Sequence, residues 1–132
     1  MRLAPTLASL MVVLSAVTCA FGVCPVMMVS GVGERDNIVV TFRNAGKLPI
    51  RQLEFNCTPV QSHVVGQTNA CRERNALFYP GMQYTVRYPY PGRSRGTVTV
   101  AVKSVMLSDG FVWRPSRKQP CRSLRIVPRK AR

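Results

Sequence analysis

The chain has 132 residues, of which 19 are Lys or Arg and 5 are Asp or Glu, so its formal net charge at pH 7 is +14. A chain of this length can bury one hydrophobic core of modest size, which favours a single domain. The acidic residues are scattered along the sequence, at Glu34, Asp36, Glu54, Glu73 and Asp109. They nominate no carboxylate pair for acid–base catalysis, whereas the positive charge favours binding to polyanions or anionic surfaces.

The N-terminal segment has the pattern of an export signal, a cationic start followed by an apolar run. Arg2 is the one charged residue among the first 28, and Leu7–Val17 is apolar. We predict a signal peptide over residues 1–20, with cleavage after Ala20, and a mature domain over residues 21–132. An uncleaved signal anchor is the alternative, because Leu3–Val23 is long enough to span a membrane. The domain is therefore expected to be secreted or periplasmic, or membrane-anchored with the domain outside the cytoplasm.

Four cysteines follow the predicted cleavage site: Cys24, Cys57, Cys71 and Cys121. An even number of cysteines in a small exported domain indicates disulfides. We predict a local bridge between Cys57 and Cys71, whose loop of about 15 residues is worth about 3 kcal/mol in the chain-entropy model. The pair Cys24–Cys121 then ties the first segment to the last. A zinc site is the alternative, but no Cys-x-x-Cys occurs and His63 is the single histidine, so no metal ligand is nominated.

Short runs with period-two alternation of apolar and polar residues follow the signal, as is typical of strands. In the first half of the domain the pattern predicts strands over Cys24–Ser30, Asn37–Arg43 and Ile50–Cys57. The segment Thr58–Asn75 is polar and irregular, and we expect a loop there that the Cys57–Cys71 disulfide spans.

The second half of the domain continues the same alternation. Strands are predicted over Met82–Tyr88, Thr97–Lys103 and Ser123–Val127. Between Leu107 and the run Phe111–Trp113, the Asp109-Gly110 dipeptide predicts a two-residue hairpin with a type I′ turn.

The aromatic residues of this half have different expected places. Tyr84 and Tyr88 share a strand face with Val86 and are expected in the core or at its edge. Tyr90 lies between two prolines and is expected to be exposed.

The fold expected from about seven or eight short strands is two antiparallel sheets packed face to face, a small all-β sandwich. Each strand has one apolar face that must be buried, and a single exposed sheet cannot bury all of them. The residues expected to be buried together are Val40, Phe42, Leu53, Phe55, Val86, Val98 and Val100.

The segments VVTFRNAGKLPIRQLEF and LFYPGMQYTV, followed by a valine-rich strand, resemble small exported immunoglobulin-like domains of bacteria, including the FxLYD type. The likeness covers about residues 38–102, in which a strand ends in Asn, a polar turn with Pro follows, and a Pro-Gly pair precedes a later strand. The resemblance implies an antiparallel immunoglobulin-like β-sandwich of about seven strands and implies no catalytic residue.

The C-terminal stretch Arg114–Arg132 holds eight basic residues and no acidic residue. A solvated chain end is the favoured interpretation of this stretch, and salt-sensitive binding of anions there is the alternative hypothesis. The basic residue Arg125 falls inside the predicted last strand. The predicted anion-binding residues are Arg114, Arg117, Lys118, Arg122, Arg129, Lys130 and Arg132.

We therefore expect an exported, non-catalytic binding or structural module of the cell envelope or extracellular space. Its expected partner is an envelope or extracellular macromolecule, with an anionic polymer or membrane surface as the specific version. A cationic membrane-active or polyanion-binding effector is the alternative, and a small hydrolase is the least favoured one. No catalytic residue, metal ligand or small-molecule cofactor site is nominated.

Overall fold

The computed structural model describes residues 23–60, 69–91 and 96–129. The predicted signal peptide and His63 lie outside these ranges. Within them the chain forms eight strands and contains no helix that could cross a membrane. The strands are β1 (Val26–Gly33), β2 (Asn37–Asn44), β3 (Ile50–Pro59), β4 (Asn69–Glu73), β5 (Gln83–Pro89), β6 (Val98–Leu107), β7 (Val112–Trp113) and β8 (Leu124–Ile126).

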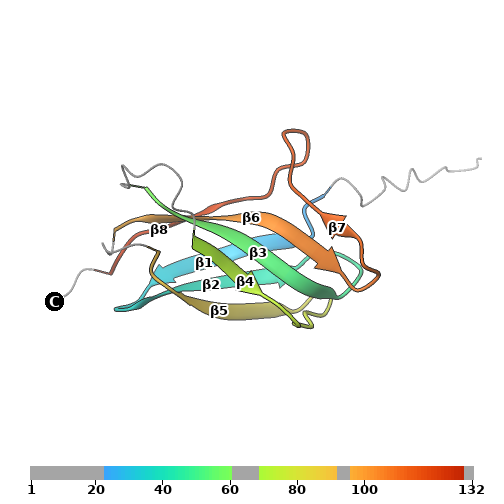
Figure 1. Ribbon diagram of the computed structural model, residues 1–132, viewed down its shortest axis with the longest axis horizontal. Coiled ribbons are helices and arrows are strands. Elements are labelled where there is room, and N and C mark those ends of the chain that lie inside the picture. The colour runs from blue at the N-terminus through green and yellow to red at the C-terminus, as the bar shows by residue number, and fades with distance from the viewer. Residues whose placement is uncertain (1–22, 61–68, 92–95, 130–132) are drawn as a thin grey trace, which may run out of the picture.

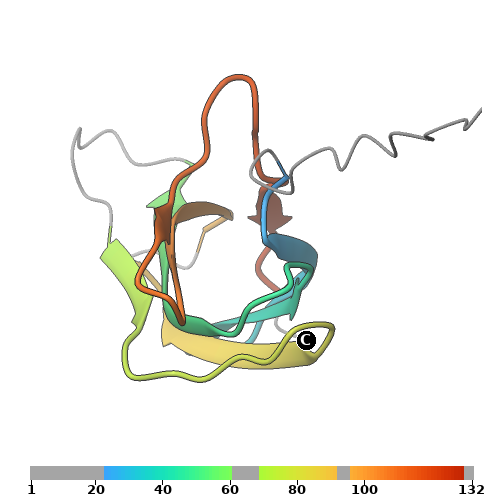
Figure 2. The ribbon, with the colours of Figure 1, turned by 90° about the vertical axis from the view of Figure 1, so that its right-hand side faces the viewer.

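Two antiparallel sheets pack face to face (Figures 1 and 2), which confirms the predicted all-β fold. The smaller sheet has the strand order β1-β2-β5, and the larger has the order β4-β3-β6-β7, with β8 pairing with β6. All pairings are antiparallel, and the most extensive is that of β3 with β6, from Ile50↔Leu107 to Pro59↔Val98.

The core lies between the sheets, where each strand contributes the apolar side of its period-two pattern. The structure confirms the burial of six predicted core residues: Val40, Phe42, Leu53, Phe55, Val98 and Val100. Val86 is the exception, because it is half-buried and packs against the rim of the core. It belongs to β5, which forms the edge of the smaller sheet, so neighbours cover its side chain less completely.

Phe42 lies at the centre of an aromatic cluster that joins the two sheets. Its ring centroid is 5.0 Å from that of Phe78 and 5.9 Å from that of Phe55, both in edge-to-face geometry. Tyr84 stacks at an angle on Phe78, with 4.7 Å between centroids. Aromatic pairs at such distances stabilise a core by about 0.5–1.5 kcal/mol beyond the area that they bury. Tyr84 is half-buried, which confirms its predicted place at the edge of the core.

The last strand, β8, closes one side of the sandwich (Figure 2). It pairs with β6 and lies beside β1, although it forms no ladder with β1. A Cβ atom on Gly31 would lie 2.5 Å from Cγ1 of Ile126, and a Cβ atom on Gly33 would overlap the hydroxyl of Tyr90. The two glycines of β1 therefore create the space into which β8 and Tyr90 pack. Tyr90 is half-buried for this reason, and the prediction that it is exposed is wrong.

The expected loop over Thr58–Asn75 is wrong in its second half, where the chain forms β4. This strand pairs with β3 in the register Phe55↔Cys71 and Cys57↔Asn69, and the predicted Cys57–Cys71 disulfide joins the two strands. The sequence of β4, Asn-Ala-Cys-Arg-Glu, shows no apolar alternation, so its strand character comes from pairing with β3 rather than from a hydrophobic face.

The predicted hairpin around Asp109-Gly110 is present, but its turn differs from the predicted type. Gly110 has a positive φ of 88°, whereas Asp109 does not. The amide of Gly110 donates to the carbonyl of Leu107 at 2.9 Å, and the amide of Leu107 donates to the carbonyl of Phe111 at 2.9 Å. This is the pattern of a three-residue loop with a type I turn followed by a left-handed glycine. Oδ1 of Asp109 accepts a hydrogen bond of 2.9 Å from the amide of Phe111, which fixes the turn.

Phe55→Ala tests the inward register of β3. Phe55 is fully buried and its ring contacts the rings of Phe42 and Tyr88. Emptying such a site should lower the free energy of unfolding by about 3–5 kcal/mol, measured by denaturant titration. The same change at the half-exposed Phe111 should cost less than half as much, and a loss below about 1 kcal/mol at Phe55 would contradict the register.

Tyr88 supplies a pH-dependent test of the core. Burial raises the pKa of its hydroxyl well above the ordinary value of about 10, and the nearby Glu73 carboxylate raises this pKa further. The hydroxyl is buried, and the Glu73 carboxylate is the polar group that interacts with it. The unfolded chain therefore loses this proton at lower pH than the folded chain, so its contribution to stability falls as pH rises above about 10.

We expect Tyr88→Phe to change the free energy of unfolding at pH 7 by no more than about 1 kcal/mol, because the hydroxyl that it removes interacts only weakly with Glu73. Above about pH 10 the stability of the variant should decline less steeply than that of the wild type. Denaturant unfolding at both pH values measures the difference. An equal loss of stability in the variant and the wild type at alkaline pH would contradict the prediction.

Candidate anion-binding surface

The connection between β7 and β8, residues 114–123, contains four basic residues and no acidic residue: Arg114, Arg117, Lys118 and Arg122. We call this segment the cationic loop. All four basic side chains are exposed to solvent. Within the described part of the chain, none of them forms a hydrogen bond or ion pair, so their charges are available to an external anion.

A tight turn forms the tip of the cationic loop. The amide of Ser116 donates to the carbonyl of Gln119 at 3.2 Å, and the amide of Gln119 donates to the carbonyl of Ser116 at 3.1 Å. Oγ of Ser116 also accepts from the amide of Gln119 at 3.2 Å. Arg117 and Lys118 occupy the two central positions of this turn, and Figure 2 shows the loop standing away from both sheets. The turn therefore presents two adjacent cations to solvent.

The base of the cationic loop is fixed at several points. Cys121 forms the predicted disulfide with Cys24, with 5.3 Å between the Cα atoms. On one side of the loop Trp113 is buried in β7, and on the other Leu124 is buried in β8. Because these anchors order the segment before any ligand arrives, binding there avoids part of the entropy cost of ordering a loose chain end.

The structure separates the predicted anion-binding residues into two groups. Arg114, Arg117, Lys118 and Arg122 come together in the cationic loop. Arg129 is exposed beyond β8, and that segment leaves the sandwich at the end away from β7 (Figure 1). Lys130 and Arg132 lie outside the described residues. Arg125 is exposed on β8, whose buried Leu124 and Ile126 confirm the expected last strand.

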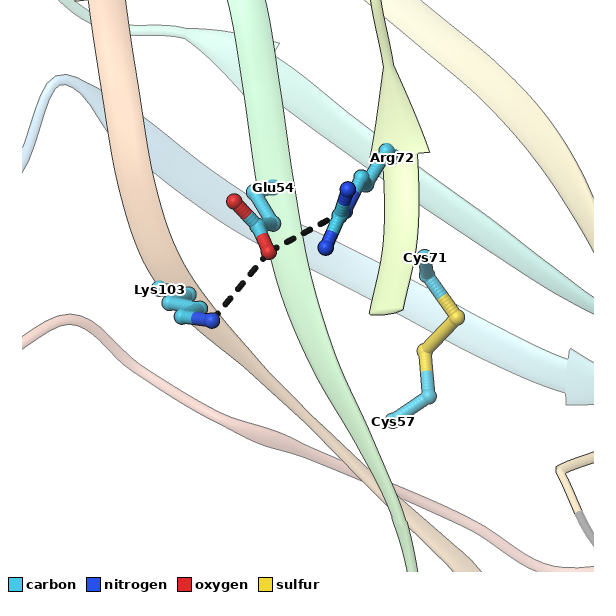
Figure 3. A network of polar contacts seen from close by, with 5 residues as sticks. All are labelled: Glu54, Cys57, Cys71, Arg72 and Lys103. Atoms are coloured by element: carbon cyan, nitrogen blue, oxygen red, sulfur yellow. Dashed lines mark hydrogen bonds and ion pairs between the residues drawn. A yellow bond between two sulfur atoms is a disulfide. The ribbon is translucent and has the colours of Figure 1, made fainter. Parts of the chain in front are cut away.

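Basic residues on the larger sheet differ from those of the loop, because they pair with an acid. Oε1 of Glu54 lies 3.2 Å from Nε of Arg72 and 3.2 Å from Nζ of Lys103 (Figure 3). Such exposed pairs contribute only about 0–1 kcal/mol each to stability, but they neutralise charge locally. Sequence reasoning missed this network, since the partner Arg72 lies on β4, directly opposite Glu54 in the ladder.

An apolar groove of about 310 Å³ adjoins the base of the cationic loop. Cys24 lines the groove and forms the disulfide with Cys121 of the cationic loop. Trp113, which also lines the groove, immediately precedes Arg114. Sequence reasoning missed the groove, because its walls come from three segments far apart in the chain. The lining residues are Val23, Cys24, Pro25, Ala45, Gly46, Lys47, Leu48, Leu107, Asp109, Phe111 and Trp113.

No protein-family model and no curated protein matches the chain. It is similar to a solved structure described as "X-ray structure of Northeast Structural Genomics Consortium target SoR45", with 11% sequence identity and a TM-score of 0.41. The match covers 77% of this chain and 81% of that chain. That description names no activity, and a likeness at this level carries no argument about function.

The double variant Cys24→Ser/Cys121→Ser tests whether the disulfide orders the cationic loop. We expect faster amide exchange at Ser116 and Gln119, and a loss of about 2–4 kcal/mol in the free energy of unfolding. The matched variant Cys57→Ser/Cys71→Ser removes the other disulfide and should lower stability without changing exchange in the loop. Unchanged amide exchange at Ser116 and Gln119 in the first variant would show that the disulfide does not order the cationic loop.

Proposed function

We propose that this protein is an exported, non-catalytic binding module that contacts an anionic macromolecule or surface through its cationic loop. The observation that carries the proposal is the loop itself: four exposed basic residues, without an acid among them, are held on a disulfide-anchored turn. Clustered and unpaired cations on an ordered segment form the electrostatic footprint of polyanion binding.

The location follows from the cysteine chemistry together with the N-terminal pattern. Two disulfides indicate an oxidising compartment outside the cytoplasm. Together with the apolar run that follows Arg2, they support a secreted or periplasmic protein whose partner is an envelope or extracellular macromolecule. The strand motifs between residues 38 and 102 support an immunoglobulin-like sandwich of the FxLYD type.

The cationic loop is a better candidate than the chain end beyond β8. Exposed charges act through a field that salt screens with a length of about 8 Å at physiological ionic strength. The adjacent Arg117 and Lys118 therefore act together on the same anion, and the turn between Ser116 and Gln119 keeps them adjacent. Arg129 lies on the far side of β8 from this turn and belongs to a separate group of charges.

Retention on heparin at a series of salt concentrations tests the proposal. We expect Arg117→Gln/Lys118→Gln to elute at clearly lower salt than the wild type and with a shallower salt dependence, because fewer counterions are released on binding. Arg129→Gln/Lys130→Gln removes the same charge from the other group and should shift elution less. Both pairs of positions are in exposed or terminal segments, so unfolding midpoints should not change.

Two outcomes would overturn the proposal. Equal shifts for the two double variants would show that net charge, rather than the cationic loop, governs retention. Failure of the wild type to bind heparin at physiological salt would show that the loop has no affinity for polyanions.

A further inference from the structure

The apolar groove beside the cationic loop leaves large hydrophobic side chains in contact with solvent. Val23 is 71% exposed, Phe111 48% and Leu48 38%. Hydrophobic residues scattered singly over a surface are ordinary, but a cluster of them around a groove marks an interaction site. These residues come from the chain before β1, the β2–β3 turn and the β6–β7 hairpin, which lie together at the β7 end of the sandwich (Figure 1).

Backbone and side-chain hydrogen bonds hold the walls of this groove in place. The amide of Ala45 donates to the carbonyl of Pro25 at 2.8 Å, which links the turn to the chain before β1. The amide of Ser108 donates to the carbonyl of Pro49 at 2.9 Å, which links the hairpin to the same turn. Nδ2 of the buried Asn44 donates to the carbonyl of Leu48 at 2.9 Å. The apolar side chains are therefore presented by ordered loops.

Positive charge borders the groove. Lys47 lies in its wall, and the cationic loop begins at Arg114, directly after the wall residue Trp113. Cys24 lines the groove and is bonded to Cys121 of the loop. Asp109 is the one acidic residue in the lining.

We propose that this end of the sandwich docks on the surface of a lipid bilayer that contains anionic headgroups. Phe111, Leu48 and Val23 enter the boundary between headgroups and acyl chains, while Lys47 and the cationic loop contact the headgroups. This inference rests on the proposed function and names its partner. Peripheral proteins bind anionic membranes in this way, with an apolar face in the bilayer boundary and adjacent basic residues on the headgroups.

A bilayer fits these features better than a soluble polyanion does. A polymer of phosphate, sulfate or carboxylate groups satisfies the cations but offers nothing to the apolar groove, whereas a bilayer offers charge and hydrocarbon within about 5–10 Å.

The first experiment uses the protein recovered from outside the cytoplasm and vesicles of phosphatidylcholine with or without phosphatidylglycerol. The wild type should sediment with the mixed vesicles only. Phe111→Ser/Leu48→Ser should bind them at least about tenfold more weakly, because two apolar anchors are lost, and should elute from heparin like the wild type. Val127→Ser removes an apolar residue that is more exposed, at 64%, from the far end of β8 and should bind like the wild type.

Asp109→Asn gives a gain of affinity that a merely structural role would not produce. The amide oxygen of Asn can still accept the hydrogen bond from the amide of Phe111, while the negative charge is lost. Affinity for the anionic vesicles should rise by up to about fivefold, the contribution of one charge near such a surface. Unchanged or weaker binding by this variant would place the hairpin away from the headgroups and overturn the inference.

Trp113, the single tryptophan of the chain, reports the docking face directly. Its emission should be quenched by vesicles whose acyl chains carry bromine, provided that phosphatidylglycerol is present. Binding without quenching would overturn the inference, as would vesicle binding by Phe111→Ser/Leu48→Ser at wild-type strength. If the wild type binds heparin but no vesicle, the proposed polyanion function stands and the membrane inference fails. If it binds neither, both fail.

Discussion

The close approach of β8 to β1 is the constraint on which the position of the cationic loop depends. It is possible because Gly31 and Gly33 have no side chain, so that Ile126 and Tyr90 occupy the space that a Cβ atom would fill. With β8 seated against β1, the chain before it must return across one side of the sandwich. That return path brings Cys121 to Cys24 and raises the β7–β8 connection above the sheets (Figure 2).

The distribution of the few acidic residues explains why the positive charge of the cationic loop is not cancelled. Glu54 pairs with Arg72 and Lys103 on the larger sheet, and Glu34 lies 3.7 Å from Arg87 at the rim of the smaller one. Acids are thus used to balance the basic residues of strands, where like charges on adjacent strands would repel. The cationic loop contains no acid, so its field extends into solvent rather than being cancelled within the domain.

Local patterns were sufficient to predict most of the fold but little of the site. Period-two alternation predicts β2, β3, β5 and β6, and the even number of cysteines predicts both disulfides. The strand β4 escapes prediction because only pairing with β3 makes it a strand. The partial burial of Tyr90 could not be predicted, because the backbone of Gly33 that covers its hydroxyl belongs to a distant strand. The groove combines Val23, Leu48, Leu107 and Trp113, which become neighbours only after both sheets have formed.

The disulfide between Cys24 and Cys121 spans 97 residues, and it joins the point where the chain enters the domain to the segment that carries the exposed cations. A force applied between the N-terminal side of Cys24 and the cationic loop is therefore carried by this single disulfide bond. The ladders of β1, β2, β3 and β6 lie outside that path, so such a force does not separate their strands. The point where the chain enters the domain and the cationic loop are thus mechanically coupled.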